Sequence, residues 1–364
     1  MQKIPERLLV SHFLVFFLVH SMQFGVGVLG FQRIVAKSAE NDAWISVIIG
    51  GLGIHILIWM IYKIMEKGNG DITDVHRTIF GRWVGGFLSS LLIIYFILLA
   101  ITITRTYLEV VQVWVFPGMR TWTFSLIFLF LIYYIVIGGF RTVTGIAFLG
   151  VILPFYLILS YLYPLKFSFF GNLLPIMDHS VKEMIVSAKD LTLSILGFEL
   201  LLMYYPFIKN PEKSQKWAHL GNLYTVLLYL VSMIVSLAYF SLEQLQKNIW
   251  ASITMLKIVQ LPFVERVEYI AIATWIVIIL PNVCIAIWAA SRGAKRLFKK
   301  KQRNLLIGIL LLCFFVIIQF KTRTQINMLN DMTAQIGFYL IYGYIPILFL
   351  ISFFYNKWKV RNVS

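Results

Sequence analysis

Charged residues are scarce in this 364-residue chain, at 13% of positions, whereas a soluble domain carries about 25%. Cysteine is nearly absent. Cys284 and Cys313 both fall in apolar runs, which excludes a disulfide framework and a cysteine-based metal site. Acidic residues number 16 against 32 Lys and Arg. With 60% hydrophobic residues, the composition excludes an ordinary soluble domain and predicts an integral membrane protein.

The net charge of +16 has two possible sources. A basic soluble protein suggests nucleic acid, but membrane proteins gather Lys and Arg in cytoplasmic loops and at anionic lipid. We therefore expect membrane lipid, and no nucleic acid, as a partner. The sequence contains no Walker loop, CxxC, HExxH or Ser-His-Asp grouping, so it predicts no enzyme, no metal site and no cofactor.

Long apolar runs set the organisation of the chain. A membrane-spanning helix needs about 20 mostly apolar residues. The runs predict a single all-α transmembrane domain over 1–364. Its ten expected spans lie at about 8–36, 43–65, 85–112, 122–140, 145–165, 187–208, 219–241, 267–291, 304–320 and 335–356.

The placement of Lys and Arg orients these spans. With the N-terminus inside, 20 of them lie in cytoplasmic segments, 11 lie outside and Arg105 lies within the third span. The densest cluster, RGAKRLFKKKQR at 292–303, then faces the cytoplasm, and both termini are cytoplasmic. The amphipathic indole rings of four tryptophans suit the membrane interface: Trp114, Trp122, Trp275 and Trp358.

Two outer loops are long enough to hold structure of their own. In 166–186 a short helix is expected from Ser180. In 242–266 apolar residues recur at helical spacing, which predicts a helix along the membrane surface. Those apolar residues are Ile249, Ile253, Leu256 and Val259.

The stretch MQFGVGVLGFQR, 22–33, lies inside the first span and is poor helix material. Gly25, Gly27 and Gly30 each cost about 1 kcal/mol relative to alanine in a helix interior. Glycines there have two explanations. They permit close packing of two helices, or they mark an unwound point whose free backbone groups face a ligand in a cavity. Both stay open on the sequence alone.

The sixth span is the positional counterpart of the first if the spans divide five plus five, into repeats at about 8–165 and 187–356. It reads LTLSILGFELLLMYYP, 191–206, and is interrupted by Gly197 and Glu199. Transporters with inverted repeats place broken helices at matched positions, with ligand near the bilayer midplane. A Glu inside a span is a functional candidate, although a structural bond to a neighbouring helix is an equal alternative.

The motif GVGVLGFQR, 25–33, resembles the first span of the B subunits of spore germinant receptors, the GerAB family. Gln32 stands where that family has a proline, which leaves the geometry of the bend open. Further stretches resemble the family in the same order: NDAWISVIIGG at 41–51, IGGF at 137–140, LPFY at 153–156, SILGFELLL at 194–202 and PFVERVEY at 262–269.

This resemblance implies a fold, a location and a role. The family belongs to the amino acid–polyamine–organocation (APC) superfamily, with a ten-span, five-plus-five inverted repeat of the LeuT/APC type whose first and sixth helices are broken. Its members lie in the inner membrane of bacterial spores and work with an A subunit and a lipoprotein C subunit. The B subunit is held to bind a small-molecule germinant, an amino acid or sugar, and so to trigger germination.

The expected ligand-binding residues follow from the breaks and from the spans that line the pocket in this superfamily. Around the breaks they are Gly25, Val26, Gly27, Leu196, Gly197 and Glu199; on the third span Tyr95 and Leu99; on the eighth, after Pro281, Asn282 and Ala286. For the third and eighth spans, ordinary packing or a simple kink is the alternative.

Polar residues elsewhere in the spans have plainer explanations. Arg105 and Glu109, four residues apart, are expected to pair with one another as structural residues. His20 and His55 are expected to be satisfied core histidines. Two other functions stay open beside the receptor subunit: a proton-coupled secondary amino acid transporter with the same pocket, and a structural subunit without a ligand.

Overall fold

The structure is a computed structural model that describes residues 4–68, 70–260 and 265–361. Residues 262–264 of the PFVERVEY stretch and the side chain of Trp358 lie outside that description. The first half of the chain forms α1 (Val15–Gln23), α2 (Gln32–Ala39), α3 (Ala43–Lys67), α4 (Ile72–Trp114), α5 (Thr121–Ile137), α6 (Phe140–Ile152) and a 3-10 helix η5 (Leu153–Leu162).

The second half is helical as well, apart from a two-residue strand pairing. Its elements are α7 (Val181–Asp190), α8 (Thr192–Ile195), α9 (Leu201–Tyr204), α10 (Gln215–Tyr239), α11 (Leu242–Lys247), α12 (Ala251–Leu256), α13 (Val267–Phe298), α14 (Gln302–Ile317), α15 (Arg323–Phe338), the π-helix η11 (Tyr339–Tyr344) and α16 (Ile345–Arg361). Strands β1 (Val10–Ser11) and β2 (Ile208–Lys209) pair in parallel.

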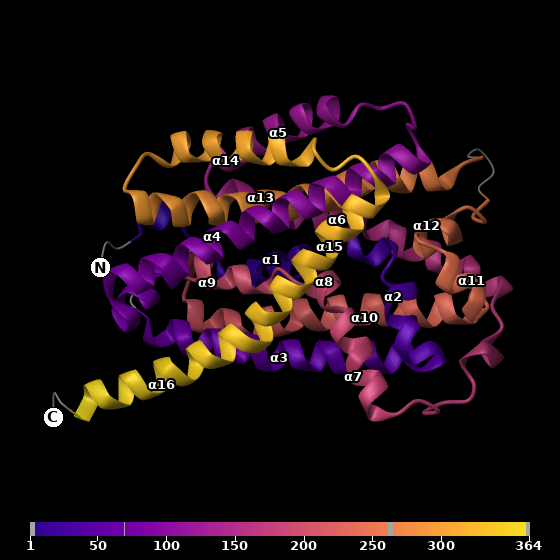
Figure 1. Ribbon diagram of the computed structural model, residues 1–364, viewed down its shortest axis with the longest axis horizontal. Coiled ribbons are helices and arrows are strands. Elements are labelled where there is room, and N and C mark those ends of the chain that lie inside the picture. The colour runs from indigo at the N-terminus through magenta and orange to yellow at the C-terminus, as the bar shows by residue number, and fades with distance from the viewer. Residues whose placement is uncertain (1–3, 69, 261–264, 362–364) are drawn as a thin grey trace.

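The long helices run side by side around a broken centre (Figure 1). α4 packs along α13 on one side, α3 packs along α10 on the other, and α1 contacts both α10 and α13. Both chain ends lead to one end of the bundle, which we call the terminal end, as the predicted even number of spans requires. The opposite end carries α2, α11 and α12, and we call it the loop end.

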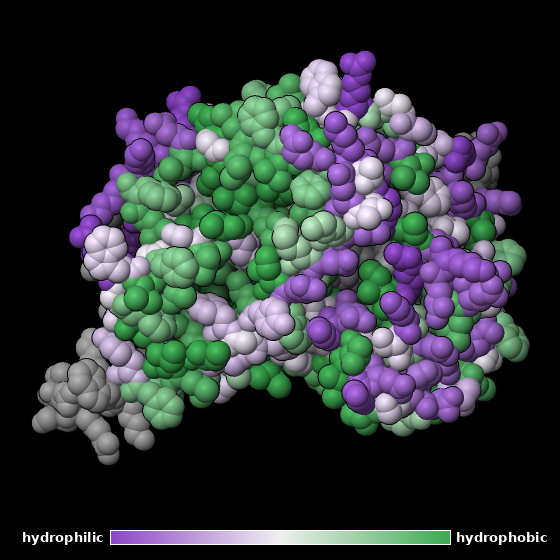
Figure 2. Space-filling view, viewed as in Figure 1, coloured by the Kyte–Doolittle hydropathy of each residue, from purple (hydrophilic) through white to green (hydrophobic). Residues whose placement is uncertain are grey.

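The helices are long and apolar enough for a multi-pass membrane protein. Six described helical segments meet both criteria: Gln32–Lys67, Ile72–Trp114, Phe140–Phe167, Pro211–Tyr239, Val267–Phe298 and Arg323–Tyr355. Shorter apolar helices occupy His12–Gln23, Thr121–Ile137 and Gln302–Ile317. The all-helical class is confirmed, and the count of ten spans stays a prediction. Figure 2 shows an apolar face over the middle of the bundle and hydrophilic residues gathered at the loop end.

The prediction of one surface helix in 242–266 is wrong. The segment forms two short helices, α11 and α12, separated by Asn248–Trp250. Ile253, Leu256 and Val259 are buried in the protein core. The apolar stripe therefore has a partner within the protein, and the segment covers the loop end of the bundle.

The helix predicted from Ser180 is confirmed as α7, with Ser180 and Glu183 forming a capping box. The loop before it is held by Asp42, a fully buried residue at the start of α3. One Asp42 oxygen accepts from the backbone N–H of Met177 at 2.8 Å, and the other accepts from Asp178 at 2.8 Å and His179 at 3.1 Å. This carboxylate therefore ties the entry of the sixth span to the second.

We expect Asp42→Asn to lower the free energy of unfolding by about 1–3 kcal/mol, because an amide has one acceptor oxygen and so cannot accept all three of these part-buried backbone hydrogen bonds. Thermal unfolding of the purified protein in detergent measures the change. Glu40→Gln is the matched control, since Glu40 is exposed and should change stability by less than about 0.5 kcal/mol. Equal effects of the two variants would contradict the assignment.

Candidate functional site

The first span is broken at the glycines. α1 ends at Gln23, and a 3-10 turn over Gly27–Leu29 precedes the start of α2 at Gln32. Between these elements, the backbone N–H groups of Gly25 and Val26 donate to no residue that the structure describes. The predicted unwound point is therefore present, with free donors in it.

Close packing at the break requires glycine. A Cβ on Gly25 would lie 2.6 Å from Nδ2 of Asn282, and one on Gly27 would lie 2.9 Å from Cα of Ser194. Neither glycine has a positive φ, so the constraint comes from the neighbours. The Ser194 backbone excludes a side chain at Gly27, whereas at Gly25 the end of the Asn282 side chain would have to shift. Both explanations of these glycines therefore apply, since the break is unwound and also closely packed.

The sixth span is broken at Gly197, which has φ +112°. α8 stops at Ile195, and helical structure resumes with a 3-10 turn at Phe198. The buried carboxylate of Glu199 closes this break. One oxygen accepts from the backbone N–H of Gly197 at 2.7 Å, and the other accepts from the hydroxyl of Tyr95 on α4 at 2.5 Å.

The two breaks meet in the centre of the bundle. The Gln23 side-chain amide donates to the Ile195 carbonyl at 3.2 Å and to Oδ1 of Asn222 on α10 at 3.0 Å. Tyr229 on α10 places its hydroxyl 3.1 Å from the Gln23 carbonyl oxygen and 2.8 Å from that of Ser194. α10 thus links the two interrupted helices through polar side chains.

A cavity of about 100 Å³ lies against the break. Six of the predicted site residues line it: Gly25, Val26, Gly27, Leu99, Leu196 and Asn282. Four do not line it: Tyr95, Gly197, Glu199 and Ala286. The structure thus brings the first-span glycines together with the third and eighth spans. It places Glu199 behind the cavity wall, where it bonds to Tyr95 and Gly197.

Two unpaired acceptors belong to the residues that line this cavity. Oε1 of Gln23 and Oδ1 of Asn282 are buried and accept no hydrogen bond from the described part of the chain. An unsatisfied buried acceptor costs about 1–3 kcal/mol. A ligand N–H or O–H would satisfy these oxygens. The cavity therefore offers both free donors and free acceptors.

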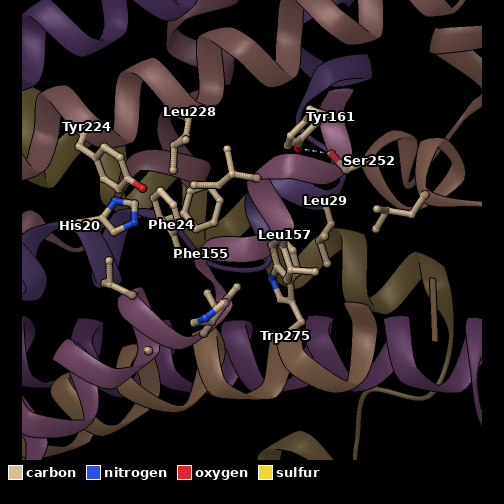
Figure 3. A pocket seen from close by; sticks show the side chains of 16 residues that line it. His20, Phe24, Leu29, Phe155, Leu157, Tyr161, Tyr224, Leu228, Ser252 and Trp275 are labelled. Carbon is tan, nitrogen blue, oxygen red and sulfur yellow. Dashed lines mark hydrogen bonds between the residues drawn. The ribbon is translucent and has the colours of Figure 1, made fainter. Parts of the chain in front are cut away.

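On the other side of the break lies a second, apolar cavity of about 50 Å³ (Figure 3). Aliphatic and aromatic side chains form most of its wall, and Phe24, Tyr224 and His20 are grouped together in it. Trp275 was expected at the membrane interface, but it is buried, and its indole N–H donates to the Gly25 carbonyl at 3.2 Å. No local sequence pattern predicts this contact, because the two residues lie 250 positions apart.

The first cavity adjoins a larger hollow of about 810 Å³ at the loop end, which we call the vestibule. Residues shared by both walls are Arg33, Ile34, Asp190, Leu193, Arg323 and Asn330. The break is therefore approached from the loop end.

Arg105 and Glu109 attract each other electrostatically, but each has a closer partner than the predicted one. The Arg105 Nε donates to the Phe320 carbonyl at 2.7 Å, and Glu109 forms an ion pair with Arg323 at 2.5 Å. Arg323 belongs to α15, which packs on α4, so a closer partner replaces the one expected four residues away. Both histidines are hydrogen-bonded as expected, but only His20 is buried, and His55 is half-buried. His20 bonds to Thr225 at 2.8 Å, and His55 bonds to His219 at 2.9 Å.

Gln32, which replaces the family proline, has a clear structural role. Its amide nitrogen donates to the hydroxyls of Ser232 at 2.9 Å and Ser252 at 2.7 Å. These bonds join the start of α2 to α10 and α12. The side chain thereby fixes by hydrogen bonding a helix start that a proline would fix by its ring.

Comparison with known proteins agrees with this architecture. Residues 9–326 match the family model described as spore germination protein. The chain is 47% identical to spore germination protein GerQB of Bacillus cereus over 97% of this chain and 98% of that one. It is 25% identical to YndE of Bacillus subtilis strain 168, over 92% and 93% of the two chains.

The fold matches a solved structure at low sequence identity. A crystal structure of MhsT in complex with L-phenylalanine aligns with a TM-score of 0.63 and 13% identity, covering 95% of this chain and 98% of that one. The LeuT-type, APC-like fold with broken first and sixth helices is therefore confirmed. The whole-chain similarity to germination proteins confirms the resemblance carried by the motifs, and the chain belongs to the spore germination protein family.

Proposed function

We propose that this chain is the B-type membrane subunit of a spore germinant receptor, and that it binds a small nutrient, an amino acid or sugar, in the cavity at the glycine break. The observation that carries the proposal is the set of unpaired polar groups there. Backbone N–H groups of Gly25 and Val26 and the amide oxygens of Gln23 and Asn282 lack partners among the described residues. Binding would favour one arrangement of the two broken helices over another and so trigger germination.

The location and partners in this proposal come from the family. A germinant-receptor B subunit would lie in the spore inner membrane with its termini on the core side and would assemble with A and C subunits. The shared end of the two termini and the cluster of Lys and Arg at 292–303 support this orientation.

Gly25→Trp tests the site in spores of the source organism. An indole at position 25 would fill the cavity, because even a Cβ there meets Asn282. We expect the response to one germinant to slow by about tenfold or more, equivalent to about 1.4 kcal/mol of lost binding. Dipicolinate release against a panel of amino acids, sugars and nucleosides measures the response, with subunit levels checked by immunoblot.

Gly308→Trp is the matched control for this experiment. Gly308 lies on α14, and no atom lies within 4 Å of a Cβ placed there. This variant should germinate like the parent spores. A Gly25→Trp variant that responds normally to every compound would remove the cavity from the proposal.

A secondary transporter for amino acids is the second candidate, because the fold is that of MhsT. The same variant separates the two functions. Normal germination together with lost amino acid uptake by the spores or by proteoliposomes would favour transport. Loss of germination without any uptake in the parent protein would favour the receptor.

A further inference from the structure

Arg33 is a charged residue without a partner at the mouth of the cavity. It is the second residue of α2 and lines both the cavity and the vestibule. It makes no ion pair and no hydrogen bond with any described residue. A cation in the first turn of a helix also faces the positive end of the helix dipole, which is its unfavourable position.

Arg323 lines the same two hollows from the opposite side. It is the first residue of α15, so it too lies at a positive helix end. Its Nη1 bonds to Glu109, and its guanidinium lies 5.2 Å from the centre of the Trp250 ring. Its Nε is buried and donates to nothing within the described chain. One face of this guanidinium is thus fixed, and one donor is unused.

The charges around the mouth do not balance these arginines. Arg33 and Arg323 repel each other electrostatically. Asp190, the carboxylate that lines the cavity, bonds to Ser38 and interacts with Lys189 and Lys37 of the vestibule wall. Asp331 also lines the vestibule, so two carboxylates there face four cations: Arg33, Lys37, Lys189 and Arg323. Asn330 accepts from Thr106 through its oxygen, so its amide nitrogen adds another donor to the mouth.

We propose that Arg33 and Arg323 form an anion site that holds the carboxylate of a small ligand at the mouth of the cavity. The guanidinium groups supply charge-assisted hydrogen bonds, which are the strong ones for a carboxylate. The free amide oxygens of Gln23 and Asn282 deeper in the cavity accept from the amino or hydroxyl group of the same ligand. The ligand is therefore an amino acid or a hydroxy acid, not a neutral sugar. This inference rests on the proposed function and specifies its ligand.

Binding to the full-length protein in detergent tests the site. The probes are the common L-amino acids as free acids and as primary amides, together with hydroxy acids, sugars, nucleosides, sodium acetate and sodium chloride. Dissociation constants come from the shift in thermal unfolding. We expect one free acid to bind and its amide to bind about tenfold more weakly or worse.

Arg33→Gln should raise the dissociation constant of the free acid by about tenfold to a hundredfold and leave that of the weakly bound amide unchanged. Because Arg33 has no described partner, the variant should fold like the parent. Lys37→Gln is the matched control: it removes the same charge four residues further along α2, outside the cavity wall, and should change binding by less than about twofold.

Three results would overturn the anion site. A sugar or nucleoside that binds equally to the parent and to Arg33→Gln would leave the proposed receptor function intact with a neutral ligand. Chloride that stabilises as strongly as any amino acid would reassign the arginines to an inorganic anion, and acetate that does so would show that no amino or hydroxyl group on the ligand is recognised. Binding of no probe to the folded parent protein would overturn the proposed function as well.

Discussion

Gly197→Ala is expected to lower the free energy of unfolding by about 2–6 kcal/mol, the sum of backbone strain and overpacking. The φ of +112° is one that a residue with a Cβ rarely adopts. The added Cβ would also lie 2.7 Å from the Cβ of Met22 on α1 and 3.1 Å from its carbonyl oxygen. The backbone strain and the overpacking both arise where the two broken helices meet.

Thermal unfolding in detergent measures this loss, and subunit abundance in spores reports it in the cell. Gly308→Ala is the control. It makes the same chemical change in a helix with open space around it and should stabilise the protein by up to about 1 kcal/mol. A Gly197→Ala protein that unfolds at the parent temperature would show that the break can adopt another backbone conformation.

Glu199→Leu is expected to destabilise the protein by about 2–5 kcal/mol. The leucine has a similar length but accepts nothing, so the Tyr95 hydroxyl and the Gly197 N–H lose their acceptor in a fully buried place. Each buried donor left without an acceptor lowers the free energy of unfolding by about 1–3 kcal/mol. The effect concerns folding of the sixth span, since Glu199 does not line the cavity.

A second variant separates this structural role from a general loss of charge. Adding Tyr95→Phe to Glu199→Leu removes one of the two donors left without an acceptor. The double variant should therefore regain about 1–2 kcal/mol of the lost free energy of unfolding. Tyr95→Phe alone should be mildly destabilising. If Glu199→Leu unfolds like the parent but no longer responds to germinant, Glu199 contacts ligand and its bond to Tyr95 is incidental.

The breaks could be predicted from the sequence because glycine and glutamate are out of place in a membrane helix. Gly25, Gly27 and Gly197 carry a cost that only a local requirement explains, and each meets such a requirement in the structure. The prediction of a cavity wall was less complete. Leu99 and Asn282 line the cavity, whereas Tyr95 and Ala286, one turn away from them on the same helices, do not.

Contacts between distant segments could not be predicted in the same way. Trp275 looks like any interfacial tryptophan until the fold places it 3.2 Å from the Gly25 carbonyl. Glu109 has its closer partner 214 positions away, so a rule based on helical spacing could not select it. The unpaired state of Arg33 is likewise a property of the assembled loop end and of no local pattern.

The hydroxyl of Tyr229 has a consequence for how the centre can move. It faces the carbonyl oxygens of Gln23 and Ser194, one on each broken helix. A hydroxyl has a single proton, so these carbonyls share one bifurcated bond and neither receives a full one. Drawing the two helices apart therefore costs less than one hydrogen bond at this point. The proton can follow either carbonyl, so each separated arrangement keeps one unshared bond.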